Sequence, residues 1–250
     1  MKSKMIFVLV LLLFSITLLA IPVEDFLIFN DFNKGFELAK AMNKNVMILF
    51  SSSSCIYCKE LKEKVLPSDD ISSFIINNYI LIELRADPDK TGNFDVENAV
   101  FDKDGKEFTY EELFYLFGIR GVPATSFFNT DLQYLGTLPG YHEKEDYLKW
   151  LKFIQQKAYE KGDISTFDDT DCCLDNGVTI REINAVILSE MQKTFPSLLS
   201  YWSFQKFTEL NFINIDTNKI YIVRDSDEEK VSSFINTLDE KNIQNIYVVN

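Results

Sequence analysis

The chain has 250 residues, 46% of them hydrophobic, so it is long enough and apolar enough to bury a substantial core. It carries 38 acidic and 25 basic side chains, which gives a net charge of −13. Phosphate binding needs a basic surface, so this balance argues against nucleic acid as a partner. The apolar content also argues against a disordered chain.

The N-terminus has the pattern of an export signal. Lys2 and Lys4 precede an uncharged, largely apolar run from Met5 to Ile21. The segment Leu18-Leu19-Ala20 makes a weak cleavage site, and the run is slightly shorter than the about 20 residues that span a bilayer. We therefore predict a signal peptide or a retained membrane anchor in residues 1–21. Either one implies a periplasmic or otherwise extracytoplasmic protein, in a compartment that permits disulfide chemistry.

Residues 24–161 alternate between helical and strand patterns, which is typical of an α/β sheet. Gly, Pro and Asp cluster between 86 and 107, which predicts a loop that contains a short hairpin. In chain order we expect a helix over 32–44, a buried strand over 46–50, a helical face at 61–66, a helix capped at 68–70 and carrying 71–76, a strand over 79–84, a helix over 109–117, strands over 124–129 and 133–137, and a last helix around 147–154.

The C-terminal part of the chain reads as a separate unit. Residues 162–177 contain several aspartates and few apolar side chains, which predicts an acidic linker. Residues 178–250 then predict a small α/β module. In it we expect an amphipathic helix that carries Ile180, Ile183, Val186-Ile187 and Met191, a strand over 219–223, a helix that opens in capping-box form at Ser226, and a closing strand over 245–249.

The motif Cys55-Ile56-Tyr57-Cys58 follows the apolar run 46–50, and three uses of the pair can be weighed. A thiolate zinc site usually needs four ligands, and the chain offers one histidine, His142, in a predicted surface turn, so we predict no metal. A structural disulfide stabilises by closing a long loop, and this gap closes almost nothing. At a helix N-terminus, however, the amide dipoles favour a thiolate and lower its pKa. Spacing and placement therefore favour dithiol–disulfide exchange, with Cys55 as nucleophile and Cys58 as resolving thiol.

With these features the chain resembles the thioredoxin superfamily over roughly residues 24–160. The matching pieces are Asn43-Lys44-Asn45 before the strand 46–50, the motif 55–59, the segment Gly118 to Ala124, and Gly136 to Tyr141 before the last helix. Among its members, exported SoxW-type thioredoxin-like proteins are similar in the excursion after Arg85 and in 138–141. The C-terminal domain of DsbD is similar around 55–63.

The resemblance implies a thioredoxin fold, a central mixed sheet flanked by helices. It also implies a cis bond between Val122 and Pro123, opposite the cysteine pair. A substrate segment would pair with the backbone there, so Ile56, Tyr57, Val122 and Pro123 are the predicted substrate-binding residues. The implied protein is an exported protein-disulfide reductase without a cofactor other than its redox-active disulfide. Its partners would be disulfide-containing proteins and a membrane electron donor of DsbD type.

The motif departs from that of thioredoxin in ways that bear on rate and potential. A buried Asp usually lies six residues before the first cysteine and a Trp directly before it, whereas this chain has Leu49 and Ser54. Glu60 or Glu63 offers a carboxylate for proton transfer, although surface positions fit both better. A second function therefore stays open, that of a redox-inactive thioredoxin-fold protein that binds peptides or acts as a chaperone.

Two further features concern the C-terminal part. Cys172 and Cys173 are adjacent, and a strained bond between neighbours tends to be labile, so they are possible accessory thiols that exchange with Cys55-Cys58. The plainer reading, two incidental thiols on a linker, is favoured. The module from Val178 weakly resembles the rhodanese fold, but Arg224 stands where that family has its catalytic cysteine. We therefore predict a degenerate binding or docking module without sulfur transfer, and a small unrelated α/β unit stays open as the alternative.

Overall fold

The computed structural model describes most of the chain and contains all the helices and strands named below. The described residues are 21–85, 101–103, 106–108, 110–169, 179–210, 215–216, 218–238 and 245–249. Residues 1–20 of the predicted leader 1–21 and the cysteines Cys172 and Cys173 lie outside them.

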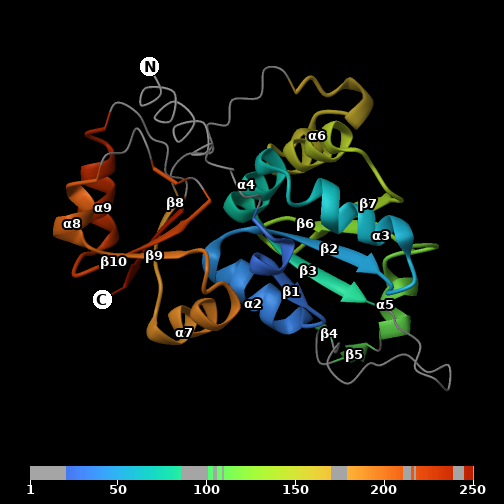
Figure 1. Cartoon of the computed structure of the whole chain (residues 1–250), viewed down its shortest axis with the longest axis horizontal. Helices are drawn as coiled ribbons and strands as arrows, with labels where there is room; N and C mark the ends of the chain where they lie inside the picture. Colours follow the sequence, from blue (N-terminus) through green and yellow to red (C-terminus); the bar gives the residue numbers. More distant parts are fainter. Residues whose placement is uncertain are drawn as a thin grey trace, which may run out of the picture.

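A five-stranded mixed sheet forms the first part of the molecule (Figure 1). Its strands, in spatial order, are β1 (Leu27–Phe29), β3 (Tyr79–Arg85), β2 (Asn45–Ser51), β6 (Ala124–Phe128) and β7 (Tyr134–Pro139). The first three run parallel, and β6 and β7 are antiparallel to their neighbours. This arrangement confirms the predicted mixed sheet. The strand β1 was not predicted, since three residues are too few for a period to appear.

Helices cover both faces of this sheet. On one face lie α2 (Phe32–Met42) and α5 (Tyr110–Leu116), and on the other lie α3 (Ile56–Glu60) with the π-helical turn Leu61–Val65, α4 (Asp69–Asn78) and α6 (Lys144–Gln155) (Figure 1). Because the sheet is covered twice, β2 and β3 are buried along nearly their whole length. Continuous apolar runs, rather than alternating ones, are what such strands require.

Local signals set the ends of α2, the first long helix. The side chain of Asp31 accepts a hydrogen bond from the backbone N–H of Lys34 at the start of the helix. Asn43 ends it in the left-handed conformation with φ of 54°. Within the helix, a Cβ on Gly35 would lie 2.2 Å from Cδ1 of Ile82, so α2 approaches β3 closely at that point.

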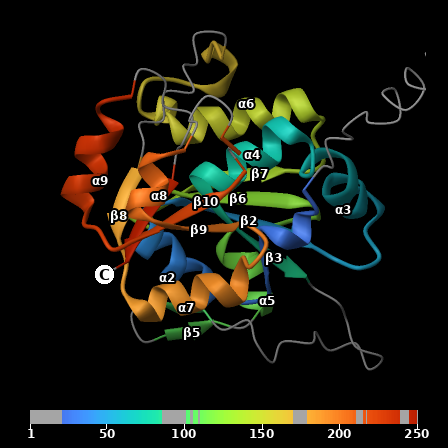
Figure 2. The same ribbon diagram turned by 60° about the vertical axis from the view of Figure 1, so that its left-hand side comes forward.

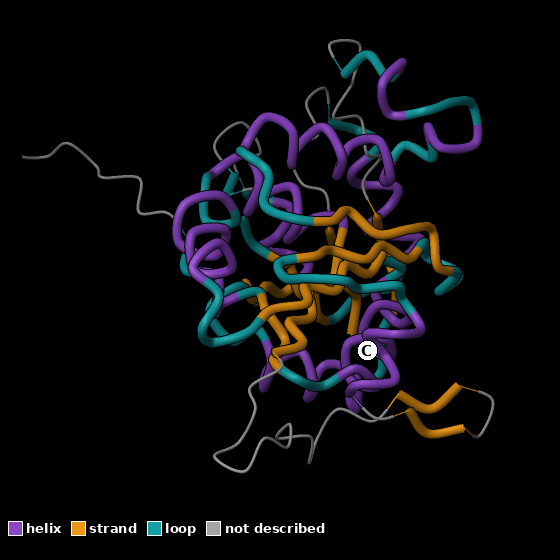
Figure 3. The backbone as a smooth tube through the Cα atoms, turned by 90° about the vertical axis from the view of Figure 1, so that its right-hand side faces the viewer, coloured by secondary structure: helices purple, strands orange, loops and turns teal. Residues whose placement is uncertain are grey.

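The described part of the 86–107 excursion contains the expected hairpin. Strands β4 (Phe101–Lys103) and β5 (Lys106–Phe108) pair antiparallel, outside the two larger sheets (Figures 1 and 3).

A second sheet of four parallel strands lies in the C-terminal part (Figure 2). Its strands, in spatial order, are β8 (Thr179–Glu182), β11 (Asn245–Val249), β10 (Ile220–Arg224) and β9 (Leu199–Ser203), and its helices are α7 (Ala185–Thr194), α8 (Phe204–Thr208) and α9 (Glu228–Ile235). The expected small C-terminal α/β unit is thus a parallel sheet with its own helices.

Two local predictions for this unit were wrong. The helix expected to include Ile180 begins only at Ala185, after Asn184 accepts a hydrogen bond from the N–H of Ile187. Ile180 instead lies in β8, where pairing with β11 overrides the helical spacing of the apolar side chains. In α9 the capping residue is Asp227, one position after the expected Ser226, and it accepts from the N–H of Lys230.

The second unit packs on the ends of two helices of the first. Tyr247 OH donates to the carbonyl of Met42 at 3.1 Å, and Asn245 Nδ2 donates to the carbonyl and the side-chain oxygen of Asn77, both at 2.9 Å. Arg181 reaches the carbonyls of Lys40 and Ala41. The last carbonyls of α2 and α4, which no helix can satisfy internally, therefore find donors in the second unit.

Apolar side chains continue across the same contact. Leu188 and Met191 of α7 and Tyr247 of β11 belong to one buried cluster with the core of the first sheet. Within the predicted linker, Phe167 packs edge-on against Phe153 of α6, with 5.5 Å between ring centroids. Residues 170–178, which include the rest of that linker, lie outside the described residues.

Candidate active site

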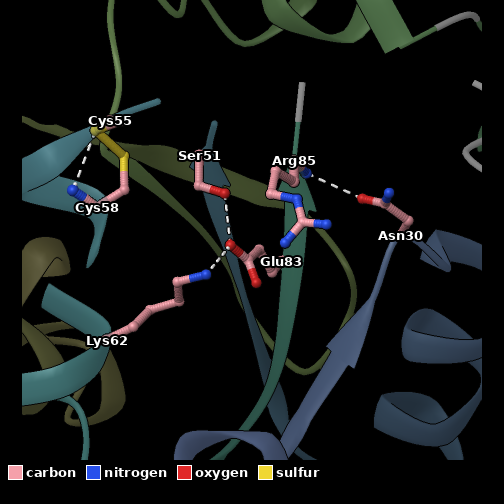
Figure 4. A network of polar contacts seen from close by, with 7 residues as sticks. All are labelled: Asn30, Ser51, Cys55, Cys58, Lys62, Glu83 and Arg85. Carbon is pink, nitrogen blue, oxygen red and sulfur yellow. Dashed lines mark hydrogen bonds and ion pairs between the residues drawn. A yellow bond between two sulfur atoms is a disulfide. The ribbon is translucent and has the colours of Figure 1, made fainter. Parts of the chain in front are cut away.

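The cysteine pair lies where β2 ends and α3 begins. Cys55 caps α3, and its Sγ accepts a hydrogen bond from the backbone N–H of Cys58 at 3.1 Å. The two sulfurs form a disulfide, with 5.2 Å between the Cα atoms (Figure 4). Cys58 is only 1% exposed, whereas Cys55 is half-buried. An outside thiol or disulfide can therefore reach Cys55 far more easily than Cys58.

The four serines before Cys55 make the turn between strand and helix. Ser51 is the last residue of β2 and is buried, while Ser53 and Ser54 are exposed. The N–H of Cys55 donates to the carbonyl of Ser52 at 3.2 Å, which closes the turn. Small polar side chains allow this tight reversal and leave the first sulfur uncovered.

Val122 and Pro123 face the pair from the start of β6. Their peptide bond is cis, as the family resemblance implied. The carbonyl oxygen of Val122 lies 3.5 Å from Cys55 Sγ. Pro123 itself is buried, and its carbonyl accepts a hydrogen bond from the N–H of Gly140. The chain at 122–123 is thus held against the sulfur that solvent can reach.

Exposed apolar side chains surround the pair. Ile56 is 69% exposed and Tyr57 is 58% exposed, both on the first turn of α3. The ring of Tyr57 lies 6.0 Å from that of Tyr141, which follows β7. The structure thus brings the four residues predicted to bind substrate to one end of the first sheet. Their binding role stays a prediction.

The carboxylates Glu60 and Glu63 lie on the outer side of the same helix. Glu60 pairs with Lys64 at 2.7 Å, and Glu63 pairs with Lys59 at 3.7 Å. These pairs are exposed, and the hydrogen bond to Glu60 raises the pKa of Lys64. Both glutamates are therefore solvated surface charges and not buried groups beside Cys58.

Sequence reasoning missed a buried polar cluster behind the disulfide. Glu83 of β3 is 3% exposed, and its Oε1 accepts from Ser51 Oγ at 2.5 Å and from Lys62 Nζ at 2.7 Å (Figure 4). In the strand register Glu83 lies directly beside Leu49, the residue that stands at the usual aspartate position. A single acidic residue within the apolar strand 79–84 was the available signal.

Other ligand sites have little support. Among the described residues no group of three or more His, Cys, Asp or Glu side chains is arranged to hold a metal ion. The imidazole of His142 lies in the turn between β7 and α6, with Nε2 3.1 Å from the carbonyl oxygen of Pro139. Within the described ranges, no helix has the length and apolarity to cross a membrane.

A buried parallel strand, a helix capped by a Cys-x-x-Cys disulfide and a cis-proline facing it together define a thioredoxin-fold domain with a dithiol–disulfide site. The family model described as a thioredoxin-like domain matches residues 32–155. This domain therefore belongs to the thioredoxin superfamily, as its motifs predicted.

Several solved structures are similar to about half of this chain. A thioredoxin-fold protein from Helicobacter pylori is 18% identical, with 57% of this chain and 91% of that chain covered and a TM-score of 0.38. A thioredoxin from Thermus thermophilus is 20% identical, with 57% and 98% covered and a TM-score of 0.41. The oxidised C-terminal domain of DsbD from Neisseria meningitidis is 16% identical, with 52% and 90% covered and a TM-score of 0.33. No curated protein sequence matches the chain.

Proposed function

We propose that the protein is an exported thiol–disulfide oxidoreductase that reduces disulfides of other proteins. The observation that carries the proposal is the asymmetry of the pair: Cys55 is half-buried at a helix start, and Cys58 is buried three residues later. A nucleophile must reach its substrate, whereas a resolving thiol must reach only its partner cysteine.

In the reducing direction, the Cys55 thiolate attacks one sulfur of a substrate disulfide. A mixed disulfide forms, and the other substrate sulfur leaves with the electron pair. Cys58 then attacks Cys55 Sγ, which forms the Cys55–Cys58 bond and releases the second substrate sulfur as a thiolate. The structure corresponds to this oxidised end state, in which the two sulfurs are bonded.

The surroundings of Cys55 support both the thiolate and substrate docking. The N–H of Cys58 already donates to Cys55 Sγ, and a donor to a thiolate stabilises its charge. The exposed side chains of Ile56 and Tyr57 offer apolar contacts, and the backbone at Val122, beside Pro123, offers pairing to an extended segment. We therefore assign a substrate segment to the space above Cys55, between α3 and the start of β6.

The direction of the exchange reaction, the cellular location of the protein and the source of its electrons are parts of the same proposal. The basic and then apolar N-terminus supports export, and the family resemblance supports a membrane electron donor of DsbD type. In this setting the protein would be kept reduced while the surrounding compartment is oxidising. Exchange between Cys55-Cys58 and Cys172-Cys173 stays the alternative to the favoured interpretation of the second pair as incidental thiols.

Insulin reduction tests the activity. The dithiothreitol-reduced protein should reduce insulin, and Cys55→Ser should abolish the reaction because no nucleophile remains at the helix start. Equal rates for the two proteins would leave the redox-inactive, peptide-binding alternative. A glutathione titration of Cys55–Cys58 then tests the direction: a potential near ~−270 mV supports a reductase, and one near ~−120 mV supports an oxidase.

A further inference from the structure

The two larger sheets have four edge strands, β1, β7, β8 and β9, and three of them carry a feature that hinders further pairing. A free edge can pair with a strand of another chain, so natural proteins shorten, bend or cover such strands. Strand β1 has only three residues, and β7 contains Pro139 and a bulge at Leu135, which β6 does not pair. At β8 the N–H of Glu182 points away from the sheet and donates to the carboxylate of Glu228 in α9.

The fourth edge strand, β9, has none of these features. It is five residues long, it pairs with β10 in unbroken register, and it contains neither a proline nor a charged residue. None of its residues is buried, whereas the first four residues of the adjacent β10 all are. Among the described strands, none pairs with the outer side of β9. This edge is therefore open to an added strand.

The outer side of β9 presents backbone donors and acceptors. The N–H of Ile220 donates to the carbonyl of Leu198, which shows which residues of this segment face β10. Along a strand of a parallel pair, successive residues direct their N–H and carbonyl groups alternately toward the paired strand and away from it. The even-numbered residues of β9 therefore face β10. The odd-numbered ones, centred on Tyr201, direct their backbone groups outward.

Charge favours a second copy of this chain as the occupant of the edge. The chain carries a net charge of −13, so two copies repel each other unless they meet at a neutral surface. Residues 195–205, which include β9, contain no charged side chain. Two such strands that run antiparallel about a twofold axis place Tyr201 opposite Tyr201 of the second copy. No like charges then face each other across the pair, and the two aromatic rings are cross-strand neighbours.

We propose that two copies of this chain form a dimer by antiparallel pairing of their β9 strands, which joins two four-stranded sheets into one sheet of eight strands. The N–H of Tyr201 donates to the carbonyl of Tyr201 in the second copy, and the reverse bond forms by symmetry. The joined sheet ends in β8 on both sides, where Glu228 already accepts the outward N–H of Glu182. Assembly therefore stops at two chains.

The dimer leaves both redox sites accessible, and the inference does not rest on the exchange reaction. The second unit closes the end of the first sheet at Lys44, whereas Cys55 lies at the opposite end of β2 (Figure 1). Pairing through β9 of the second unit therefore covers neither cysteine pair.

Sedimentation equilibrium of the purified full chain tests the dimer. We expect the mass of one chain at about 1 µM and of two chains at about 200 µM, because one pair of strands buries less surface than a standard interface. Tyr201→Pro removes an outward N–H but leaves the bonds to β10, and proline is tolerated at such edge positions. Each copy then loses one intermolecular hydrogen bond, so the dissociation constant should rise about 10- to 30-fold. Tyr201→Lys places two cations opposite each other and should also weaken the dimer.

The matched control is Val186→Lys, which adds the same charge at an exposed residue of α7 and should leave the dimer unchanged. Association through any other part of the chain would be equal in all of these proteins. Amide hydrogen exchange then locates the contact within the strand. The N–H of Tyr201 should gain protection as the concentration rises, whereas the N–H of Trp202, which faces β10, should not change.

Three results would overturn the proposal. A wild type that stays monomeric at the highest concentration would leave the edge to a strand of another protein. A dimer that persists equally in both Tyr201 variants would lie on another surface. A dimer that forms without added protection of the Tyr201 amide would not be joined by backbone pairing. None of these results bears on the oxidoreductase, which insulin reduction tests separately.

Discussion

The two ends of the first sheet each bury one charged residue, and the two residues have different kinds of partner. Glu83, near the end of β3 beside the disulfide, has a cation and a hydroxyl as partners. Lys44, just before β2 at the other end, is 3% exposed and donates to the carbonyl of Ile76 at 2.6 Å. Burial lowers the pKa of Lys44 to about 7.

The difference follows from what covers each end. The end with Lys44 is closed by the second unit, whose Phe195, Leu198 and Ile220 lie around the same small cavity as Lys44. The end with Cys55 keeps Ile56 and Tyr57 exposed. We therefore expect the end with Lys44 to contribute to stability and the end with Cys55 to be accessible for the exchange reaction.

Removing a buried aromatic contact at the closed end should lower the stability of the protein and leave the redox site unchanged. Tyr247 is fully buried and donates to Met42, so Tyr247→Ala loses a packed ring as well as a hydrogen bond. We expect a loss of about 3–5 kcal/mol in the free energy of unfolding, measured by urea denaturation. The Cys55–Cys58 potential should not change.

Tyr201→Ala is the control, since this tyrosine of β9 is 41% exposed and stacks against Arg224. It should cost less than about 1 kcal/mol. A shift of the redox potential in Tyr247→Ala, at a temperature where it is folded, would contradict the separation of the two ends.

Lys44→Met should stabilise the protein in a pH-dependent way. Because the folded-state pKa of Lys44 is lowered, the unfolded chain binds more protons between about pH 7 and the ordinary value of 10.5, and wild-type stability rises with pH across that window. Below pH 7 the wild type carries the full cost of a buried charge. The advantage of the variant should therefore be greatest there, and about 3 kcal/mol larger at pH 6 than at pH 9.5.

Chemical denaturation at these two pH values measures the effect. Lys40→Met, an exposed lysine near the end of α2, should show no comparable pH dependence. If the two variants have parallel profiles, the second unit does not hold Lys44 in a dry environment.

At the open end, Ile56→Ser should lower activity with little change in stability. The side chain is 69% exposed, so its loss removes contact with a bound substrate and not with the core. We expect kcat/KM for insulin to fall about 5- to 10-fold, as for one apolar contact of about 1 kcal/mol. Val186→Ser, at 66% exposure on α7, is the remote control and should have no effect. Equal kcat/KM for the two variants would remove Ile56 from the docking surface.

The amino-acid sequence by itself determined the four longer strands of the first sheet and the position of the cysteine pair. Residues 46–50 are apolar without a break and residues 79–84 are apolar except for Glu83, a pattern that fits strands covered on both faces, and the motif at 55–58 follows the first of them. These are local signals. They failed at Ile180, where strand pairing with Ile246, 66 residues away, outweighed helical spacing.

Only the tertiary structure decided which residues share the site and what closes the far end. Ser51, Lys62 and Glu83 are separated along the chain by up to 32 residues, and no local period links them. The same holds for Asn245 and Asn77, which are 168 residues apart. Parallel pairing and helix packing bring such groups together, because a buried polar atom must find a partner wherever the fold places one.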